Sequence, residues 1–184
     1  IIADETQRCS RVVQELLNYA RKDKCCGETC DLNQLAQDLI ETFINCRLKR
    51  YRIEIVMDLS PERLIAEGGC GQLDIVLTNL LANAIDALNA TEQPCITVRT
   101  WREESYVAVS VTDNGPGVPD DIRNRLFDLF FSTKEVGQGY GLGLSISQAI
   151  VAKRGGFIAY DTNHAGGARF VIKLPAVDLK RANL

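Results

Sequence analysis

Two pairs of segments with alternating apolar and polar residues constrain the fold of this chain most strongly. Residues 95–103 and 105–113 are separated by one residue, and residues 156–162 and 168–175 form a second pair near the end of the sequence. Such short connections join antiparallel strands, because parallel strands need a crossover of a dozen or more residues. The pattern therefore predicts two hairpins and disfavours a doubly wound parallel sheet.

Helical periodicity is confined to the segments before and between these hairpins. The spacing of apolar residues predicts helices over about 31–48, 70–90, 119–127 and 142–154, and a further strand over 51–57. Helices placed between hairpins cover one face of a sheet. We therefore expect an α+β fold, a two-layer α/β sandwich whose mixed, mostly antiparallel sheet is covered by about three helices and preceded by a helical bundle segment.

The first residues predict a separate helical element. Apolar residues over 1–22 recur at alternating steps of four and three, which is typical of a helix that packs on other helices, in a hairpin or dimer bundle or singly in a core. Residues 23–30 are interpreted as a linker, 31–176 as the main domain and 177–184 as a C-terminal tail. Because the sequence begins without Met in what reads as mid-helix, we expect a fragment that lacks its upstream partner.

The composition argues against two classes of interaction. The net charge is −3 and the Lys and Arg residues are scattered, so no basic surface is expected and nucleic acid is not an expected partner. No apolar run approaches the ~20 residues that span a bilayer, and the start of the sequence lacks the order of a signal peptide. We expect this part of the protein to be soluble.

The chain has seven cysteines, an odd number, and they fall into two groups. Four stand singly among apolar or helical residues: Cys9, Cys46, Cys70 and Cys95. Buried reduced thiols have such surroundings, and they indicate a reducing compartment. The other three, Cys25, Cys26 and Cys30, form the cluster CCGETC, whose spacing matches no standard zinc site. Its role stays open at this point.

The helix predicted over 70–90 carries a polar stripe beside its apolar side. At ~100° per residue, Gln72, Asn79, Asn83 and Asp86 fall within an arc of about 60°. Asparagine is a mediocre helix former, so two of them one turn apart indicate either exposure to solvent or a ligand that the stripe faces. Amide oxygens suit a hard cation such as Mg²⁺, and Asn83 is the expected metal ligand.

The segment DNGPGVP follows directly after a predicted strand. Asp113 ends the strand, Gly115 and Gly117 allow backbone conformations or close approach that larger residues do not, and Pro119 starts a helix. A plain turn has a similar composition. However, the apolar, aromatic segment LFDLFFSTK (126–134) and a glycine-rich loop come after the same strand, and the set indicates a binding site.

That loop is GQGYGLGLSIS, residues 137–147. It lacks the spacing of a dinucleotide-binding fingerprint and the lysine of a Walker loop. Nevertheless, Gly139, Gly141 and Gly143 allow close approach of the backbone, and the helix that follows offers free N–H groups with partial positive charge. Phosphate is the ligand that this arrangement favours, with a flexible loop before a core helix as the alternative.

These motifs resemble the conserved boxes of one enzyme family. NLLANAIDAL, DNGPGVP, LFDLFFSTK, GQGYGLGLSIS and GGARFVIKLP are similar to the N, G1, F, G2 and final glycine boxes of sensor histidine kinases, in that family's order and spacing. The resemblance covers about residues 31–175. It implies the ATP-binding fold shared with DNA gyrase, heat-shock chaperones and mismatch-repair ATPases.

The resemblance also implies roles for individual residues. Asn83 would hold Mg²⁺, and Asp113 would accept a hydrogen bond from the adenine amino group. Phe130 and Phe131 would anchor the ATP lid, and Lys134 would approach the phosphates. The residues implied to contact ATP are Asn79, Asn83, Asp86, Asp113, Gly115, Gly117, Lys134, Gly139, Tyr140, Gly141, Leu142 and Gly143.

Two positions depart from the pattern of the family. Tyr140, at the end of the expected lid (about 116–140), stands where many members have a small hydroxyl residue, and GGCGQ (68–72) replaces an acidic residue and a proline. Enzymes of this fold that hydrolyse ATP place a glutamate where this chain has Asn79. Because a neutral amide does not take up a proton from water, transfer to a nucleophile is favoured over hydrolysis.

The resemblance implies partners as well. The only histidine, His164, lies between the last two predicted strands, and residues 1–22 resemble the second helix of a dimerisation hairpin, so the acceptor histidine is expected on an upstream helix. ATP, that phosphoacceptor helix and a response regulator receiver domain are the expected partners, in a homodimer formed through the N-terminal helix. We expect a cytoplasmic domain of a protein anchored in the inner membrane. A GHKL-type ATPase and a catalytically dead dimerisation module are the alternatives.

Overall fold

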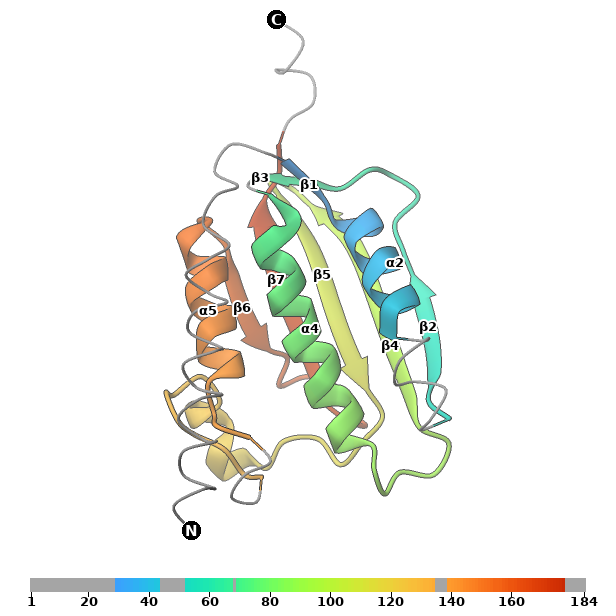
Figure 1. Cartoon of the computed structure of the whole chain (residues 1–184), viewed down its shortest axis with the longest axis vertical. Helices are drawn as coiled ribbons and strands as arrows, with labels where there is room; N and C mark the ends of the chain where they lie inside the picture. Colours follow the sequence, from blue (N-terminus) through green and yellow to red (C-terminus); the bar gives the residue numbers. More distant parts are fainter. Residues whose placement is uncertain (1–28, 44–51, 68, 135–138, 178–184) are drawn as a thin grey trace, which may run out of the picture.

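A computed structural model describes residues 29–43, 52–67, 69–134 and 139–177. In chain order the elements are β1 (Thr29–Asp31), α2 (Leu32–Phe43), β2 (Glu54–Asp58), β3 (Ile65–Glu67), α4 (Cys70–Ala87), β4 (Cys95–Glu103), β5 (Tyr106–Asp113), the 3₁₀ helix η3 (Asp120–Arg125), α5 (Gly143–Lys153), β6 (Phe157–Tyr160) and β7 (Arg169–Pro175). They form a sheet with helices on one face, so the predicted α+β sandwich is confirmed (Figure 1). The helix predicted over 1–22 lies outside the described residues.

The main sheet has five strands in the order β2-β4-β5-β7-β6. Both predicted hairpins are present, as β4–β5 and β6–β7, and among the strands that the structure describes only β2 pairs in parallel, with β4. The helix predicted over 119–127 is the 3₁₀ helix η3 instead of an α-helix. Because β5 is hydrogen-bonded to β4 on one side and to β7 on the other, Asp113 stands at the end of a central strand.

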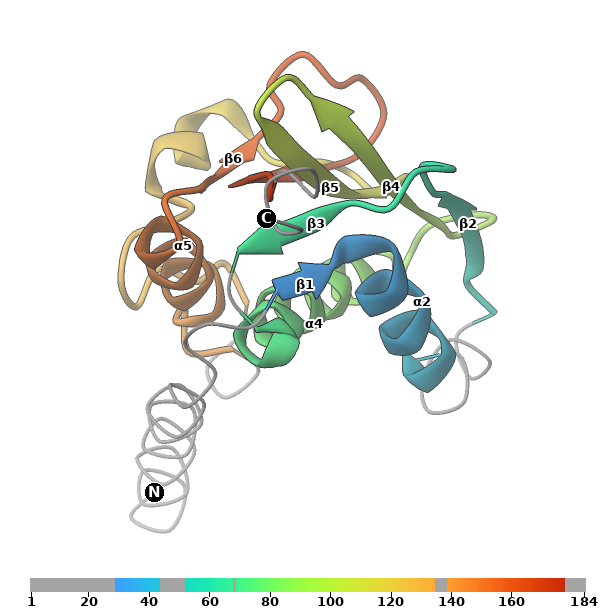
Figure 2. The ribbon, with the colours of Figure 1, turned by 90° about the horizontal axis from the view of Figure 1, so that it is seen from above.

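The helices α2, α4 and α5 cover one face of this sheet (Figure 2). Alternate residues of β5 contribute to the core between the two layers: Val107, Val109 and Val111 are each at most 2% exposed. The apolar side predicted for α4 packs on it through Leu73, Val76, Leu77, Leu80, Ala84 and Leu88, whereas Ala87 is exposed. None of the described helices combines the length and apolar character needed to cross a membrane.

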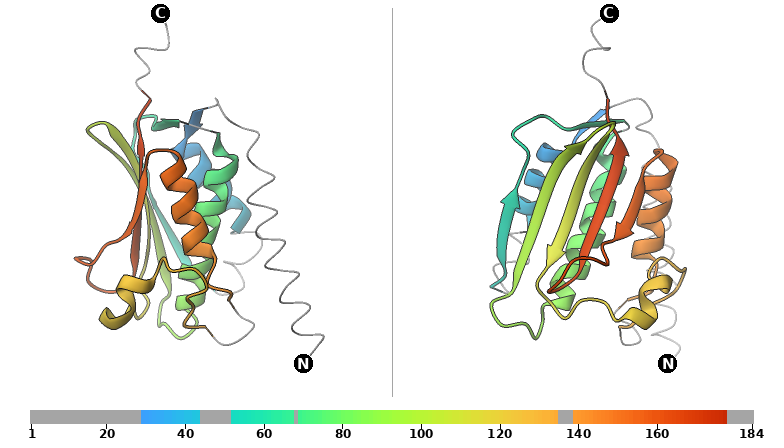
Figure 3. Two further views of the ribbon diagram at one scale, coloured as in Figure 1. Left: turned by 90° about the vertical axis from the view of Figure 1, so that its left-hand side faces the viewer. Right: turned by 180° about the vertical axis from the view of Figure 1, so that it is seen from behind.

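The other face of the sheet has no helix over it among the described segments (Figure 3). Flat aromatic and long cationic side chains lie over its centre instead. The guanidinium carbons of Arg99 and Arg169 lie 5.9 and 5.8 Å from the centroid of the Trp101 ring. Lys173 forms an ion pair with Glu103 at 2.7 Å. These side chains shield the sheet from water, with the side chains of Arg169 and Lys173 themselves about three-quarters buried.

A second, two-stranded sheet of β1 and β3 is absent from the sequence prediction. Strands of three residues are too short to show alternation, and β1 begins at Thr29, within the segment expected to be a linker. Cys30 of β1 forms a disulfide with Cys70, the first residue of α4. This small sheet therefore joins the start of the domain to the start of α4.

The disulfide corrects one interpretation of the cysteines. Cys70 is bonded to Cys30 across a sequence separation of 40, so it is not an isolated reduced thiol, and it no longer supports a reducing compartment. Among the described cysteines, Cys95 is free. The residues Cys9, Cys25, Cys26 and Cys46 lie outside the described part of the chain.

Replacement of Cys70 by serine is expected to lower the free energy of unfolding of the oxidised protein by about 2–4 kcal/mol, because the disulfide closes a long loop in the unfolded chain. Chemical denaturation measures the difference. Cys95→Ser removes a free thiol and is the matched control, with little change expected. Equal stability of Cys70→Ser and the wild type would contradict the bond.

Candidate functional site

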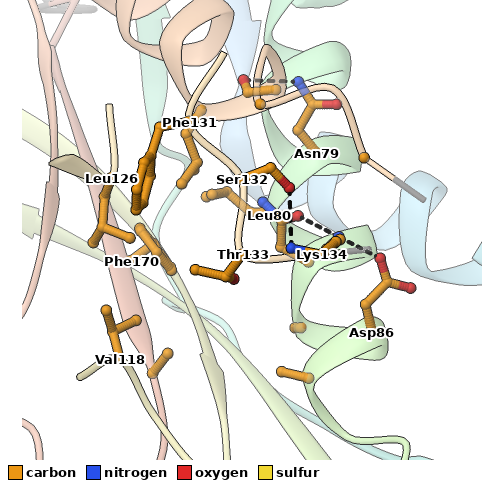
Figure 4. A pocket seen from close by; sticks show the side chains of 18 of the residues that line it. Asn79, Leu80, Asp86, Val118, Leu126, Phe131, Ser132, Thr133, Lys134 and Phe170 are labelled. Atoms are coloured by element: carbon orange, nitrogen blue, oxygen red, sulfur yellow. Dashed lines mark hydrogen bonds and ion pairs between the residues drawn. The ribbon is translucent and has the colours of Figure 1, made fainter. Parts of the chain in front are cut away.

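A large cavity opens where α4, the start of α5 and the segment after β5 meet (Figure 4). Its volume is about 1290 Å³, which exceeds that of most small-molecule sites and accommodates a ligand of nucleotide size. The predicted site residues that line it are Asn79, Asn83, Asp86, Asp113, Gly117, Phe131, Lys134, Gly139, Tyr140, Gly141, Leu142 and Gly143. Motifs from distant parts of the sequence thus meet at one cavity.

Three residues predicted to belong to the site do not line the cavity. Gln72 is buried in the first turn of α4 and does not line the cavity, although Asp74 and Ile75 close to it on the helix do. Gly115 lies behind Asp113, and its backbone N–H donates to Oδ1 of that carboxylate at 2.9 Å. Phe130 is 69% exposed, although its neighbour in the lid does line the cavity.

Asn79 connects the two helices beside the cavity. Its amide nitrogen donates to the carbonyl oxygen of Gly143 at 3.2 Å and to the buried hydroxyl of Ser147 at 3.3 Å. The Ser147 hydroxyl in turn donates to the same carbonyl oxygen at 2.7 Å. The amide therefore fixes the start of α5, and with it the end of the glycine-rich loop, against α4.

Asn83 and Asp86 both contact the same cation. The ammonium nitrogen of Lys134 lies 3.2 Å from Oδ1 of Asn83 and 2.5 Å from Oδ2 of Asp86 (Figure 4). The amide oxygen of Asn83 thus points to a place in the cavity where a positive charge is held. Lys134 was expected beside phosphates, and in this structure its contacts are to α4.

Asp113 is held by β7 as well as by its own strand. Its Oδ1 accepts hydrogen bonds from the N–H groups of Gly115 and Ala168, at 2.9 and 3.2 Å, and its own N–H donates to the carbonyl oxygen of Ala168 at 2.9 Å. Burial raises the pKa of the Asp113 carboxyl, and those two hydrogen bonds oppose the rise. A buried, positioned acceptor therefore lies at the end of β5.

Gly167 makes this arrangement possible; the sequence analysis included it in the final glycine box GGARFVIKLP but assigned it no role. Its φ is +117°, and any Cβ at this position would overlap the carbonyl oxygen of Asp113. Only glycine lets the chain before β7 approach so closely. The available signal was the pair of glycines that, with Ala168, precede the strand Arg169–Pro175, but a turn between two strands has the same composition.

The glycine-rich loop packs on the backbone of the lid. The N–H of Phe130 donates to the carbonyl oxygen of Gly141 at 3.0 Å. Gly141 has a φ of +67°, and a Cβ there would overlap backbone atoms of Phe130 and Phe131. After the loop, α5 begins at Gly143 with no side chain that caps its first N–H groups. Free backbone donors of this kind bind anions.

Comparison with known families identifies this architecture. Residues 71–178 match the family described as histidine kinase-, DNA gyrase B- and HSP90-like ATPases. The chain belongs to this family. Membership implies that this domain binds ATP, and the cavity is large enough for a nucleotide.

Individual relatives of the domain are sensor kinases. Sensor kinase CckA of Brucella abortus is 34% identical over 198 residues, which cover 99% of this chain and 20% of that protein. The solved catalytic domain of histidine kinase ThkA has a TM-score of 0.72 at 31% identity, over 81% of this chain and 95% of that one. ThkA in complex with the response regulator TrrA gives a TM-score of 0.76 at 28% identity, over 96% and 50%. The chain is thus a catalytic domain of the sensor kinase type. It spans about a fifth of the length of CckA.

An apolar wall suits the flat base of the nucleotide that the family binds. Val118, Leu126, Phe131 and Phe170 lie together on one side of the cavity (Figure 4). Phe170 packs in turn on Tyr160, with ring centroids 5.5 Å apart. Of these residues the sequence analysis had assigned only Phe131 to the site, because apolar strand and lid residues carry no signal that separates a ligand wall from a core.

The burial of Asp113 predicts a pH dependence of stability. Because the pKa of Asp113 is raised, the folded state binds a proton more tightly than the unfolded state. Protonation of Asp113 therefore stabilises the fold. This stabilisation is complete below the ordinary pKa of 3.8 and is lost as the pH rises through the raised pKa. Asp113→Asn should therefore gain stability relative to the wild type as the pH rises. Denaturation at several pH values measures this, and a parallel pH dependence in both proteins would contradict it.

Gly141→Ala is expected to lower the affinity for an ATP analogue by at least about tenfold, because the added Cβ forces the glycine-rich loop away from the lid. Titration calorimetry measures the affinity. Gly166→Ala is the matched control, since φ is also positive there, at +87°, but nothing lies within 4 Å of the added Cβ. Similar losses in both variants would show that backbone strain, and not the lid contact, matters.

Proposed function

We propose that this domain transfers the γ-phosphoryl group of ATP to a histidine on another segment, as the catalytic part of a two-component sensor histidine kinase. The observation that carries the proposal is the convergence of three different groups on one cavity: the amide oxygen of Asn83, the carboxylate of Asp113 and the backbone of the loop around Gly141. They match a metal, an adenine and a phosphate chain respectively.

The adenine end of the proposed complex is defined by Asp113. The hydrogen bonds that the described residues donate to its carboxylate reach Oδ1. Oδ2 is then the atom that accepts from the adenine amino group. The base would pack against the wall that includes Phe131 and Phe170, which line the same cavity.

The residues present fit a magnesium ion at the phosphate end. The described residues contain no group of three His, Cys, Asp or Glu side chains that holds a metal alone. Mg²⁺ is commonly held by one or two protein oxygens together with substrate phosphates and water. Asn83 supplies such an oxygen, and the Lys134 ammonium 3.2 Å from it supports the assignment, because this oxygen already contacts a cation. The bound ion would neutralise phosphate charge during transfer.

One observation favours transfer over hydrolysis, and a second bears on where the acceptor lies. The amide nitrogen of Asn79, at the position of the hydrolytic glutamate, donates to Gly143 and Ser147, so the side chain is engaged in a structural contact. It offers no base to a water molecule. The only histidine of the chain, His164, does not line the cavity, so we place the phosphoacceptor elsewhere, on an upstream helix.

The remaining partners follow from the same proposal. ThkA was solved in complex with a response regulator, and we propose that the phosphoryl group here passes to an aspartate of such a receiver domain. We further propose a homodimer formed through the helix predicted over 1–22, and the domain boundaries 31–176 for the catalytic part. The domain would act in the cytoplasm, within a protein anchored in the inner membrane.

The test is to incubate the chain and labelled ATP with a separate helix that carries a histidine. Acid-labile label on the helix is expected. Asp113→Asn should weaken ATP binding by about 10- to 100-fold, because it removes a charged hydrogen-bond acceptor, and Asn83→Ala should abolish transfer. Asp161→Asn, which alters an aspartate paired with Arg169 outside the cavity, is the control.

Three outcomes would contradict the proposal. Steady release of phosphate without an acceptor would indicate a hydrolase. Absence of ATP binding in a titration would indicate a module with a dead site, in which Tyr140 blocks the phosphates. Transfer that persists in both site variants would refute the assignment of Asn83 and Asp113.

A further inference from the structure

The side chain of Lys134 lies at the junction of three elements of the site. Its ammonium group contacts Asn83 and Asp86 of α4, and its backbone N–H donates to the hydroxyl of Ser132 at 3.2 Å (Figure 4). Its stem lies against the glycine-rich loop, since a Cβ on Gly139 would be 3.0 Å from Cδ of Lys134. The lysine therefore links the end of the lid and the glycine-rich loop to α4.

The ammonium group and a metal ion compete for one oxygen. Lys134 donates to Oδ1 of Asn83 at 3.2 Å, and this is the oxygen that would coordinate Mg²⁺ at about 2.1 Å. Two cations at one amide oxygen repel each other strongly in a partly enclosed cavity, where the effective dielectric constant is well below that of water. Both cannot occupy this oxygen together.

The contacts that hold the lysine are weak enough to exchange. Its side chain is 32% exposed and that of Asp86 is 46% exposed, and ion pairs this accessible to water contribute little to stability. A metal on Asn83 replaces the lost positive charge beside Asp86. The phosphate chain, bound nearby against the glycine-rich loop, offers the ammonium group a new anionic partner.

We propose that Lys134 is a positioning residue that exchanges partners. Without nucleotide it holds the end of the lid on Asn83 and Asp86, and Mg²⁺ arriving with ATP displaces its ammonium group onto the phosphates. The inference rests on the proposed function. It predicts that a nucleotide without metal leaves the lysine on α4, so the site distinguishes the metal complex of ATP from free ATP.

The test is a double-mutant cycle with Lys134→Met and Asp86→Asn, read by hydrogen exchange of the amides of residues 131–134. In the nucleotide-free chain each single variant should speed exchange about two- to fivefold. The double variant should exchange no faster than either single variant. Lys173→Met and Glu103→Gln form the matched control cycle, because that ion pair lies on the opposite face of the sheet and should leave these amides unchanged.

The cycle is then repeated with a non-hydrolysable ATP analogue, with MgCl₂ or with a chelator. The coupling between Lys134 and Asp86 should vanish with the analogue and Mg²⁺, and should persist with the analogue and chelator. No coupling in the nucleotide-free chain, or coupling that survives Mg²⁺ and analogue together, would overturn the inference. Loss of coupling with the analogue alone would also overturn it.

A separate titration distinguishes this failure from failure of the proposed function. If the analogue binds with Mg²⁺ but the coupling does not change, the exchange of Lys134 is wrong and the nucleotide site stands. If the analogue does not bind at all, the proposed function fails and the inference fails with it.

Discussion

The hydrogen bonds around Asp113 are the interaction on which the site depends. The carboxylate of Asp113 accepts hydrogen bonds from the N–H groups of Gly115 and Ala168. These bonds hold the end of β5 against the residue that precedes β7. This works because Gly167 has no Cβ and lets the two backbones meet. A charged acceptor buried without such donors would be unstable, and with them it presents one oxygen to a ligand.

A second set of contacts fixes the phosphate end of the same cavity. Asn79 joins α4 to the start of α5, and Gly141 joins the glycine-rich loop to the lid. Neither contact involves a ligand, yet both decide where the free N–H groups of α5 lie relative to Asn83. The two asparagines of α4 thus have different roles, since Asn79 joins two helices and Asn83 faces the cavity.

Much of the fold and site was predictable because the signals are local. Alternation over eight or nine residues predicts β4 and β5, and the spacing of α4 predicts which side faces the core. The disulfide between Cys30 and Cys70 was missed because no local pattern records a contact across 40 residues. The exclusion of Gln72 from the cavity was missed because an angular stripe does not show which of its members neighbouring elements bury. The present partners of Lys134 depend on the fold of the lid, which periodicity does not give.

The central claim is that Asn83, Asp113 and the backbone around Gly141 contact a single ATP molecule. A crystal structure of the chain with a non-hydrolysable ATP analogue and Mg²⁺ tests it most directly. The account predicts the adenine amino group at Oδ2 of Asp113, the metal at Oδ1 of Asn83 and the phosphates against the glycine-rich loop. An analogue bound elsewhere, or bound in this cavity without contact to Asn83 and Asp113, would contradict it.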